Sequence, residues 1–298
     1  MNGVLNFYKD QGITSFKAVD TVKKLFNVSK CGHLGTLDPM AEGVLPICLG
    51  YATRFADYLS SVDKEYIAQF KLGITTDSFD TTGSIVSENN EIIPIIDDIN
   101  LHLSRLEGVC SLTVPGFSAK KINGVRAYKL ARNGAIEDAG VKEMEIYSCH
   151  LLSYEYPLGV IKVKCGKGTY IRSIINELGK QIGCGAAMSG LIRSANGSFY
   201  AKDSFRLSNL QSLKERDDLS SAIIPVTDLL PWGKAVVKND VIKNISNGIS
   251  PAKNSYLSLP IESDGSNFFI TDTDGRLIAA AERQENSTVP LKIKMVFI

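Results

Sequence analysis

One aspartate stands in a stretch of sequence that would hold a carboxylate in a fixed position. Asp38 closes the run CGHLGTLD, and Pro39 restricts it to an extended backbone conformation. Gly32 and Gly35 permit tight backbone bends just before it. A carboxylate pinned in this way could act as a nucleophile. The alternative is a turn or a helix cap, because Asp followed by Pro is also common at helix starts.

A possible partner for this carboxylate is Arg172, which lies in the first turn of a helix predicted over 170–180. It falls off the apolar stripe of that helix, and a cation there opposes the helix dipole by roughly 0.3–1 kcal/mol. A substrate phosphate or Asp38 would compensate. If Arg172 pairs with Asp38, the guanidinium keeps the carboxylate charged and oriented. A plain surface arginine is the alternative.

Two more side chains could take part in chemistry. Tyr66 begins an otherwise apolar strand face, where its ring could serve as a platform for a flipped base and its phenol could exchange a proton. A core tyrosine with its hydroxyl at the edge is the alternative. His33 lies between glycines in the run before Asp38, and an ordinary loop histidine is equally compatible with that position.

Other chemistries are excluded by the motifs that are missing. The three histidines are isolated, and no H-E-x-x-H or C-x-x-C pair occurs, so zinc hydrolases and zinc deaminases are excluded and no metal is predicted. No P-loop is present. The run at 183–188 starts like a dinucleotide fingerprint but lacks its third small residue and ends a helix instead of opening one. We therefore predict no cofactor.

Composition indicates an ordinary globular protein of 298 residues, long enough for two domains. No apolar run approaches the roughly 18–20 residues of a membrane helix, and the N-terminus does not resemble a signal peptide. The six cysteines are scattered, as in reduced proteins of the cytoplasm. The net charge of +1 argues against an indiscriminate nucleic-acid binder.

The charge is nevertheless unevenly distributed. Segments 108–136 and 156–176 contain nine basic residues and no acidic ones, and aromatic residues lie among them. This mixture suits contacts to the backbone and bases of looped RNA, although a solvated surface with a random charge run would look the same. The basic residues are Lys120, Lys121, Arg126, Lys129, Arg132, Lys162, Lys164, Lys167 and Arg172, and the aromatic residues are Phe117, Tyr128 and Tyr170.

The hydrophobic pattern predicts the elements that must position these residues. Helices are expected to begin at Ser15, Thr53 and Asp98, and a half-buried strand should carry Tyr66 to Leu72. The polar stretch 73–90 is predicted to be a long loop. Residues 144–165 should form a hairpin that precedes the helix carrying Arg172.

After Trp232 the pattern changes to short strands and turns. Asp274-Gly275 between two apolar runs is a strong hairpin signal. We therefore expect two domains, residues 1–231 and 232–298, with the boundary after Pro225 and Pro231.

Several motifs together resemble one family. The run GHLGTLDPMAEGVLPICLG at 32–50 closely resembles the signature of the TruB-type tRNA pseudouridine synthases. DKEY at 63–66, LGITTD at 72–77, GTYIR at 168–172 and LIRS at 191–194 also match, in the expected order. The resemblance covers about 230 residues, and the tail after 232 resembles the small PUA-type RNA-binding domain of these enzymes.

The resemblance implies an α+β fold and an activity. The expected architecture is the pseudouridine synthase fold, with a mixed, mainly antiparallel central sheet, flanking helices and a small C-terminal PUA-like β-barrel. The family isomerises uridine-55 in the T loop of tRNA to pseudouridine by base flipping. Because this is a net isomerisation, it needs no cofactor or metal. The implied partner is tRNA through its T stem-loop, with no membrane and no obligatory protein partner. We expect a cytoplasmic monomer.

The resemblance also assigns roles to residues. Asp38 resembles the catalytic aspartate, Tyr66 the tyrosine that stacks on the flipped uracil, and Arg172 the arginine that pairs with the aspartate. The segment 108–136 is the expected RNA-clasping segment. The resemblance further implies that His33 enters the T loop, that Tyr170 and Leu191 form pocket walls, and that Lys9 supports the pocket. The basic side chains expected to contact RNA are Lys120, Lys121, Arg126, Lys129, Arg132, Lys164 and Lys167.

The chain departs from the family pattern at two places. Lys9 lacks the aspartate before it and the proline after it that complete the family's Asp-Lys-Pro motif. The segment beginning at Pro115 has Phe117 where the family has tyrosine. Two rival functions stay open at this point, a non-catalytic factor that remodels the tRNA elbow and a synthase acting on another uridine. The sequence also leaves open whether Asp38 would attack the sugar or assist elimination to a glycal.

Overall fold

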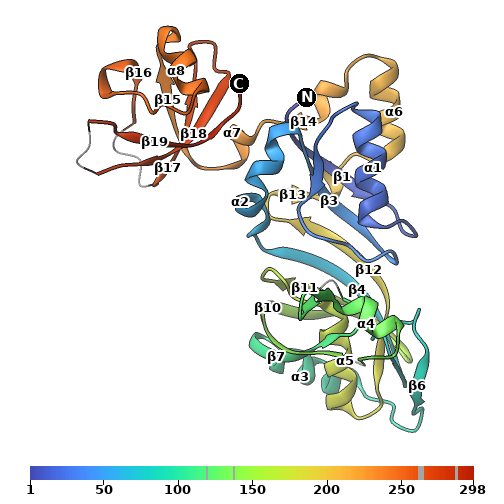
Figure 1. The fold of residues 1–298 in the computed structure, drawn as a ribbon. Helices are drawn as coiled ribbons and strands as arrows, with labels where there is room; N and C mark the ends of the chain where they lie inside the picture. The colour runs from blue at the N-terminus through green and yellow to red at the C-terminus, as the bar shows by residue number, and fades with distance from the viewer. Residues whose placement is uncertain (119, 137, 261–264, 286–287) are drawn as a thin grey trace.

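The computed structural model describes residues 1–118, 120–136, 138–260, 265–285 and 288–298 (Figure 1). Its larger sheet has ten strands, and all paired neighbours are antiparallel except β3 and β12, which run parallel. The expected mixed, mainly antiparallel sheet is confirmed. In spatial order its strands are β14 (Ile223–Ile224), β1 (Gly3–Lys9), β3 (Ala41–Leu49), β12 (Ala186–Asn196), β4 (Lys64–Leu72), β11 (Leu158–Cys165), β10 (Asp138–Glu155) and β7 (Gly108–Pro115), with β2 (Cys31–His33) beside β3 and β13 (Phe199–Tyr200) beside β12.

Alternating hydrophobicity accounts for the central strands. On β4 the side chains of Tyr66, Ala68, Phe70 and Leu72 are buried, as a strand with one core face requires. The predicted hairpin is also confirmed, because β10 pairs with β11 from Ile146 to Glu155. β4 contributes Tyr66 to the candidate site.

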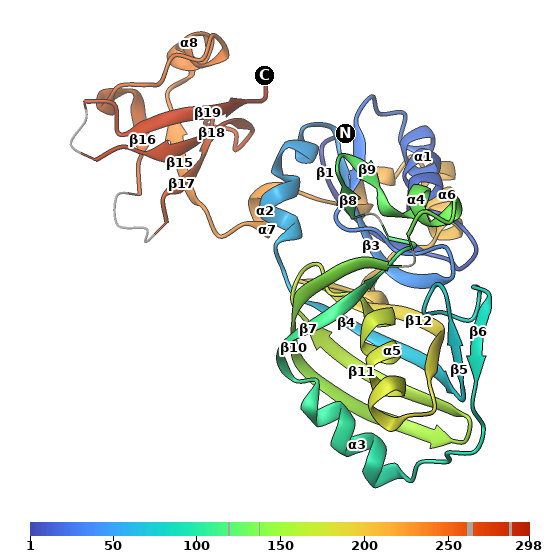
Figure 2. The same cartoon turned by 60° about the horizontal axis from the view of Figure 1, so that its bottom comes forward.

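Helices cover both ends of this sheet. α3 (Ile96–Arg105) and α5 (Ile171–Ile182) lie side by side against β10, β7 and β12 (Figure 2). α1 (Ser15–Leu25) and α6 (Leu207–Glu215) lie at the end formed by β1 and β3 (Figure 1). The predicted helix around Arg172 is confirmed, with its apolar stripe buried and Gly183 ending it in the left-handed conformation.

Three predicted helix starts shift in the structure. Thr14, not Ser15, caps α1, since its hydroxyl accepts from the Lys17 amide while Ser15 bonds elsewhere. Thr53 lies inside the 3-10 helix η1 (Gly50–Phe55), and the α-helix α2 (Ala56–Ser60) follows it. Asp98 lies in the first turn of α3, where its carboxylate accepts from the Ile95 amide.

The predicted long loop at 73–90 is wrong in part. It contains a two-stranded hairpin of β5 (Ile74–Thr76) and β6 (Ile85–Glu88). β6 is exposed throughout, so it lacks the alternation of buried and polar residues that identifies a strand in sequence. The segment 108–136 continues from β7 into β8 (Lys121–Ile122), β9 (Val125–Arg126) and α4 (Ala127–Arg132).

A second sheet of five strands follows Trp232. Asp274-Gly275 joins two of its strands, as predicted, with Gly275 at φ 80°. The expected β-barrel is not closed among the described residues, because the order ends in two edge strands. That order is β16 (Tyr256–Ser258), β15 (Gly233–Val237), β17 (Asn267–Thr271), β18 (Leu277–Arg283) and β19 (Leu291–Val296). Helix α7 (Val226–Leu229) precedes this sheet in the chain, and α8 (Ile242–Ser246) lies between β15 and β16. The remaining short 3-10 helices are η2 (Ala201–Asp203), η3 (Leu219–Ala222), η4 (Asn239–Val241) and η5 (Lys253–Ser255).

An aromatic cluster joins the two sheets. Phe55, fully buried in η1, lies 5.6 Å from Trp232, 5.9 Å from Phe269 and 5.2 Å from Phe297, measured between ring centroids. Trp232 and Phe269 are themselves 4.9 Å apart. The second sheet is therefore packed against the first part of the chain through a continuous apolar core.

Candidate active site

The loop before β3 presents Asp38 at the surface of a cavity. Ser15 fixes this loop, since its hydroxyl donates to the Leu37 carbonyl and accepts from the Leu37 amide, both at 2.9 Å. The Gly12 amide donates to the Pro39 carbonyl at 2.8 Å. Asp38 does not cap a helix, because its carbonyl accepts from Ala41, the first residue of strand β3. Its side chain is about a third exposed and available for chemistry.

Lys9 braces the same loop from below. Its side chain is fully buried, and its amine donates to the carbonyls of Asp10 at 3.1 Å, Ile13 at 2.9 Å and Ala41 at 2.5 Å. Burial lowers the pKa of Lys9 to about 8, while the charge of Asp38 works in the opposite direction. The lysine therefore ties the segment that follows it to the start of β3, even though the aspartate and proline of the family's motif are absent beside it.

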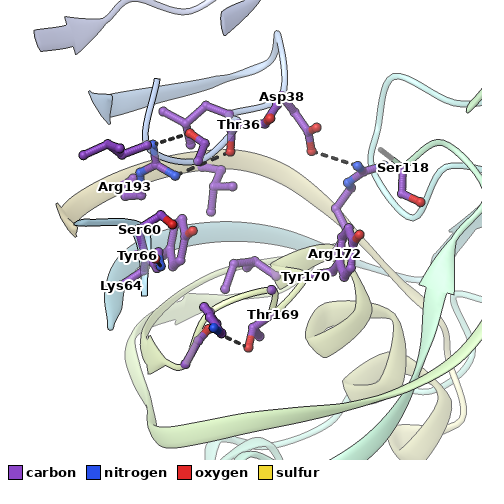
Figure 3. A pocket seen from close by; sticks show the side chains of 18 of the residues that line it. Thr36, Asp38, Ser60, Lys64, Tyr66, Ser118, Thr169, Tyr170, Arg172 and Arg193 are labelled. Atoms are coloured by element: carbon purple, nitrogen blue, oxygen red, sulfur yellow. Dashed lines mark hydrogen bonds and ion pairs between the residues drawn. The ribbon is translucent and has the colours of Figure 1, made fainter. Parts of the chain in front are cut away.

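Arg172 is the electrostatic centre of the site (Figure 3). Its guanidinium is 2.8 Å from a carboxylate oxygen of Asp38 and 3.5 Å from one of Asp80. It also donates to the carbonyls of Ser78 and Phe117, each at 3.0 Å. Since the arginine side chain is only 6% exposed, these contacts fix its position. The ion pair expected between Arg172 and Asp38 is present.

Asp80 is a site residue that the sequence reasoning missed. Its carboxylate is buried and accepts hydrogen bonds from the hydroxyls of Ser78 at 2.9 Å and Thr82 at 2.5 Å, and from the Thr82 amide at 3.0 Å. It lies in the stretch interpreted as a loop. The signal in the sequence was the Asp-x-Thr spacing, which is typical of a side chain that closes its own turn.

The cavity beside Asp38 has a volume of about 660 Å³. Tyr66, Tyr170 and Leu191 contribute to its wall, as expected, and Asp38 and Arg172 lie at its edge. Burial raises the pKa of Tyr66, and the charge of Arg193 opposes this shift, so the phenol keeps its proton at neutral pH. The other residues lining the cavity are Leu34, Gly35, Thr36, Leu37, Ser60, Lys64, Ser118, Lys142, Gly166, Lys167, Gly168, Thr169, Ile171 and Arg193.

Arg193 also supports the site and was likewise missed. It is 1% exposed on β12, and its guanidinium donates to the carbonyls of Val44 at 2.7 Å and Gly35 at 3.1 Å. These bonds hold the loop before Asp38 against the sheet, as Figure 3 shows. An arginine at an inward position between Leu191 and Ala195 was the available signal, since buried arginines are rare without partners.

His33 lies on β2, next to Leu34 of the cavity wall. Burial and the charge of Arg193 lower the pKa of His33, so its ring is neutral at pH 7. Its Nδ1 is buried and has no hydrogen-bond partner among the described residues. The structure thus places His33 near the cavity but not in its lining.

A second cavity of about 680 Å³ lies on the other side of the ion pair. It shares Thr36, Asp38, Ser118 and Arg172 with the first. Four residues of the basic and aromatic run in segment 108–136 line it, namely Phe117, Arg126, Tyr128 and Arg132.

The remaining basic residues are divided. The Lys120 amine donates to the Ala139 carbonyl at 2.7 Å, whereas Lys121 and Lys129 are exposed. Lys167 lines the first cavity and donates to the Ser61 hydroxyl at 3.2 Å. Lys164 lines a separate cavity of about 410 Å³ with Tyr200. Lys142, which donates to the Gly168 carbonyl at the cavity mouth, had not been singled out.

In the part of the chain that the structure describes, no three His, Cys, Asp or Glu side chains come together as metal ligands would. Within the same residues, no helix has the length and apolar character needed to span a bilayer. The Asp38–Arg172 ion pair lies between aromatic and aliphatic side chains.

The sequence of this chain is similar to those of one protein family. The model for "TruB family pseudouridylate synthase (N terminal domain)" matches residues 23–171. The chain is 41% identical over 263 residues to tRNA pseudouridine synthase B of Clostridium kluyveri, covering 88% of this chain and 89% of that one. It is 43% identical over 222 residues to the same-named protein of Francisella philomiragia, covering 74% of each.

Solved structures agree with the sequence comparison. A chain from a Cbf5-Nop10-Gar1 complex matches with a TM-score of 0.69 and 26% identity, covering 99% of this chain and 85% of that one. A chain from an H/ACA RNP bound to a substrate RNA containing 2′-deoxyuridine has the same fold, with a TM-score of 0.68. The expected pseudouridine synthase fold is confirmed, and the chain belongs to the TruB family of pseudouridylate synthases.

Proposed function

We propose that this chain isomerises uridine-55 in the T loop of tRNA to pseudouridine. The observation that carries the proposal is the Asp38–Arg172 ion pair of 2.8 Å at the edge of a 660 Å³ cavity. The names of the relatives from Clostridium kluyveri and Francisella philomiragia support tRNA as the substrate. The position within tRNA rests on the resemblance of the motif around Asp38.

The reaction moves one bond and conserves all atoms. The N1–C1′ bond of the flipped uridine breaks, the uracil turns, and C5 bonds to C1′. C5 then loses its proton and N1 gains one. In this proposal Asp38 either attacks C1′ or assists elimination to a glycal, and Arg172 holds its carboxylate in place. Flipping the base costs a few kcal/mol, which contacts in the cavity offset.

The cavity walls have matching roles. Tyr66 stacks on the detached uracil, and its raised pKa supports stacking over action as a base in the free enzyme. Tyr170 and Leu191 close the sides, so the ring cannot escape before it rejoins the sugar. His33, two residues before the cavity loop turns at Gly35, enters the T loop as its bases flip out.

The RNA surface is assigned to two parts of the chain. We propose residues 1–231 as the catalytic domain, with 108–136 clasping the T stem-loop through Arg126 and Arg132. Residues 232–298 serve as a PUA-like RNA-binding domain. In this proposal the enzyme works in the cytoplasm as a monomer without an obligatory protein partner, and RNA shape supplies most of the recognition.

The proposal is tested on a tRNA transcript containing C5-tritiated uridine. The purified chain should release tritium, and mapping the product should find pseudouridine at position 55. A transcript with cytidine at that position is the control and should release none. Tight binding without tritium release would favour the non-catalytic RNA factor. Pseudouridine at a different position would favour a synthase of other specificity.

A further inference from the structure

The cavity beside Asp38 is lined by many more cations than anions. Among the lining residues that the structure describes, Asp38 contributes the one carboxylate, against five basic side chains. These are Lys64, Lys142, Lys167, Arg172 and Arg193. Such an excess of positive charge around a cavity attracts an anionic group of a ligand.

Three of the five cations are engaged within the protein. Arg172 forms the ion pairs described above. Arg193 is 1% exposed, and its guanidinium donates to backbone carbonyls. Lys64 is buried as well, and its amine donates to two backbone carbonyls of the loop before β4. These three therefore hold the walls of the cavity together.

Lys142 and Lys167 are accessible at the mouth of the cavity. Lys142 is half-buried and donates to the Gly168 carbonyl at 2.9 Å, while Lys167 is exposed and donates to the Ser61 hydroxyl at 3.2 Å. Neither forms an ion pair with a carboxylate among the described residues. Since an ammonium group has three N–H donors, each lysine can bind a further acceptor.

The ammonium group of Lys142 has a defined position. Lys142 pairs with Leu112 of β7 in the sheet, and its amine lies 6.0 Å from the centroid of the Tyr170 ring. A Cβ at Gly168 would lie 2.3 Å from this amine, so the glycine leaves room for it. Figure 3 shows Tyr170 on the cavity wall beside Arg172. Lys142 therefore stands over the wall that is expected to enclose the uracil.

A nucleotide in this cavity would bring anions to its mouth. In the proposed function the ribose of the flipped nucleotide lies at Asp38 and the uracil lies in the cavity. The two phosphates that flank this ribose are bonded to it, so they must lie near the opening. A backbone phosphate accepts hydrogen bonds from lysine and is attracted by its charge.

We infer that Lys142 binds a backbone phosphate that flanks the target nucleotide, and that Lys167 adds its charge at the same opening. The inference rests on the proposed function and deepens it, because it names the substrate group that a side chain of β10 recognises. The pairing of β10 with β7 holds Lys142 in the sheet. The contact therefore fixes the ribose relative to Asp38 from a rigid element.

The first test measures turnover and salt dependence with the tritiated tRNA transcript. Lys142→Met removes the charge, Lys142→Arg keeps it, and Lys180→Met, which removes an exposed amine from α5, is the matched control. We expect Lys142→Met to raise KM about fivefold with kcat within about twofold of wild type, and Lys142→Arg to recover most of this loss. The slope of log Kd against log salt should become shallower by about 0.7–0.9 in Lys142→Met, because one phosphate contact is lost.

The second test identifies the phosphate. Kd is measured with ligated tRNAs in which a neutral methylphosphonate replaces the phosphate on the 5′ or the 3′ side of the target uridine. Each RNA and its phosphate-containing control carry a 2′-methoxy group on the nucleotide before that linkage, which prevents strand cleavage. At the contacted phosphate, wild type should lose about fivefold in affinity and Lys142→Met should lose nothing further, because its charge is already gone.

Equal losses in wild type and Lys142→Met at both linkages would overturn the inference, as would a Lys142→Met variant with the KM and salt slope of wild type. A purely structural lysine would instead lower kcat and the melting temperature together and leave the salt slope unchanged, which would also overturn it. Tritium release tests the proposed function separately. If wild type releases none, that function fails, whereas Kd and its salt slope still report whether Lys142 meets a phosphate.

Discussion

At the scale of single residues, buried cations organise the site. Arg172 joins the carboxylates of Asp38 and Asp80, and Lys9 joins three backbone carbonyls beneath the same loop. Burying either cation without partners would cost free energy, so each one is stable in its position only because these oxygen atoms surround it. The carboxylate of Asp38 is thereby left exposed on one side and fixed on the other.

Lys9 gives a prediction about pH. Its ordinary pKa of 10.5 is lowered to about 8 by burial, so between these values the unfolded chain binds a proton that the folded chain has lost. Unfolding then takes up a proton, so the contribution of Lys9 to the free energy of unfolding rises as the pH increases from about 8 to 10.5. Below pH 8 the folded chain also carries the charge, and the full cost of burying it is present.

Urea unfolding of wild type and Lys9→Met at pH 7.5 and pH 10 measures this effect. Wild type should gain stability relative to Lys9→Met at the higher pH. Lys17→Met, which removes an exposed amine, should show no such difference. Parallel pH dependence of wild type and Lys9→Met would contradict the assignment.

At the scale of elements, the close approach of β3 and β12 shapes the loop of Asp38. Gly43 on β3 has φ 108°, and a Cβ built there would lie 2.3 Å from the Arg193 carbonyl oxygen of β12. Only glycine allows this parallel pair to form at the point where Arg193 reaches under the loop. Gly32, by contrast, has open space around it and no left-handed backbone.

Gly43→Ala should therefore destabilise the chain, because backbone strain of about 1–3 kcal/mol adds to the clash with β12. Gly32→Ala should change stability by less than about 0.5 kcal/mol. Thermal unfolding of both variants measures the difference. Equal melting temperatures of Gly43→Ala and Gly32→Ala would contradict this prediction, because they would show that β12 can shift to make room for the added methyl group.

Elements with strong periodicity could be predicted from the sequence, and those held by tertiary contacts could not. Buried alternation identified the strand of Tyr66, and apolar spacing identified the helix of Arg172. The exposed strand β6 has neither signal. Asp80 and Arg193 were missed for a related reason, since each also pairs with a residue far along the chain, Asp80 with Arg172 and Arg193 with Gly35. The helix dipole offered Asp38 as one of two possible anions beside Arg172, the other being a substrate phosphate, and the family resemblance favoured Asp38.

At the scale of the whole molecule, the two sheets share a core. Phe55 of η1 lies among Trp232, Phe269 and Phe297, so the second sheet does not hang on its linker alone. In the proposed function this junction fixes the RNA-binding domain relative to the cavity. An RNA that contacts both parts would then meet a preformed surface.

Phe55→Ala should cost about 3–5 kcal/mol, because a fully buried ring is lost between the sheets. Tyr58→Ala, which removes an exposed ring 4.8 Å from Trp232, should cost only about 0.5–1.5 kcal/mol. Limited proteolysis near residue 230 should be faster in Phe55→Ala than in Tyr58→Ala. Equal resistance of both variants and wild type would mean that the junction does not depend on this ring.

The most direct measurement is tritium release by Asp38→Asn from the tRNA transcript, with tRNA affinity determined in parallel. The amide keeps the size of the side chain but removes the charge that pairs with Arg172. The account predicts that turnover falls by at least about a thousandfold while affinity stays close to that of wild type. Turnover near the wild-type rate would contradict it, because the reaction would then not depend on the carboxylate at the edge of the cavity.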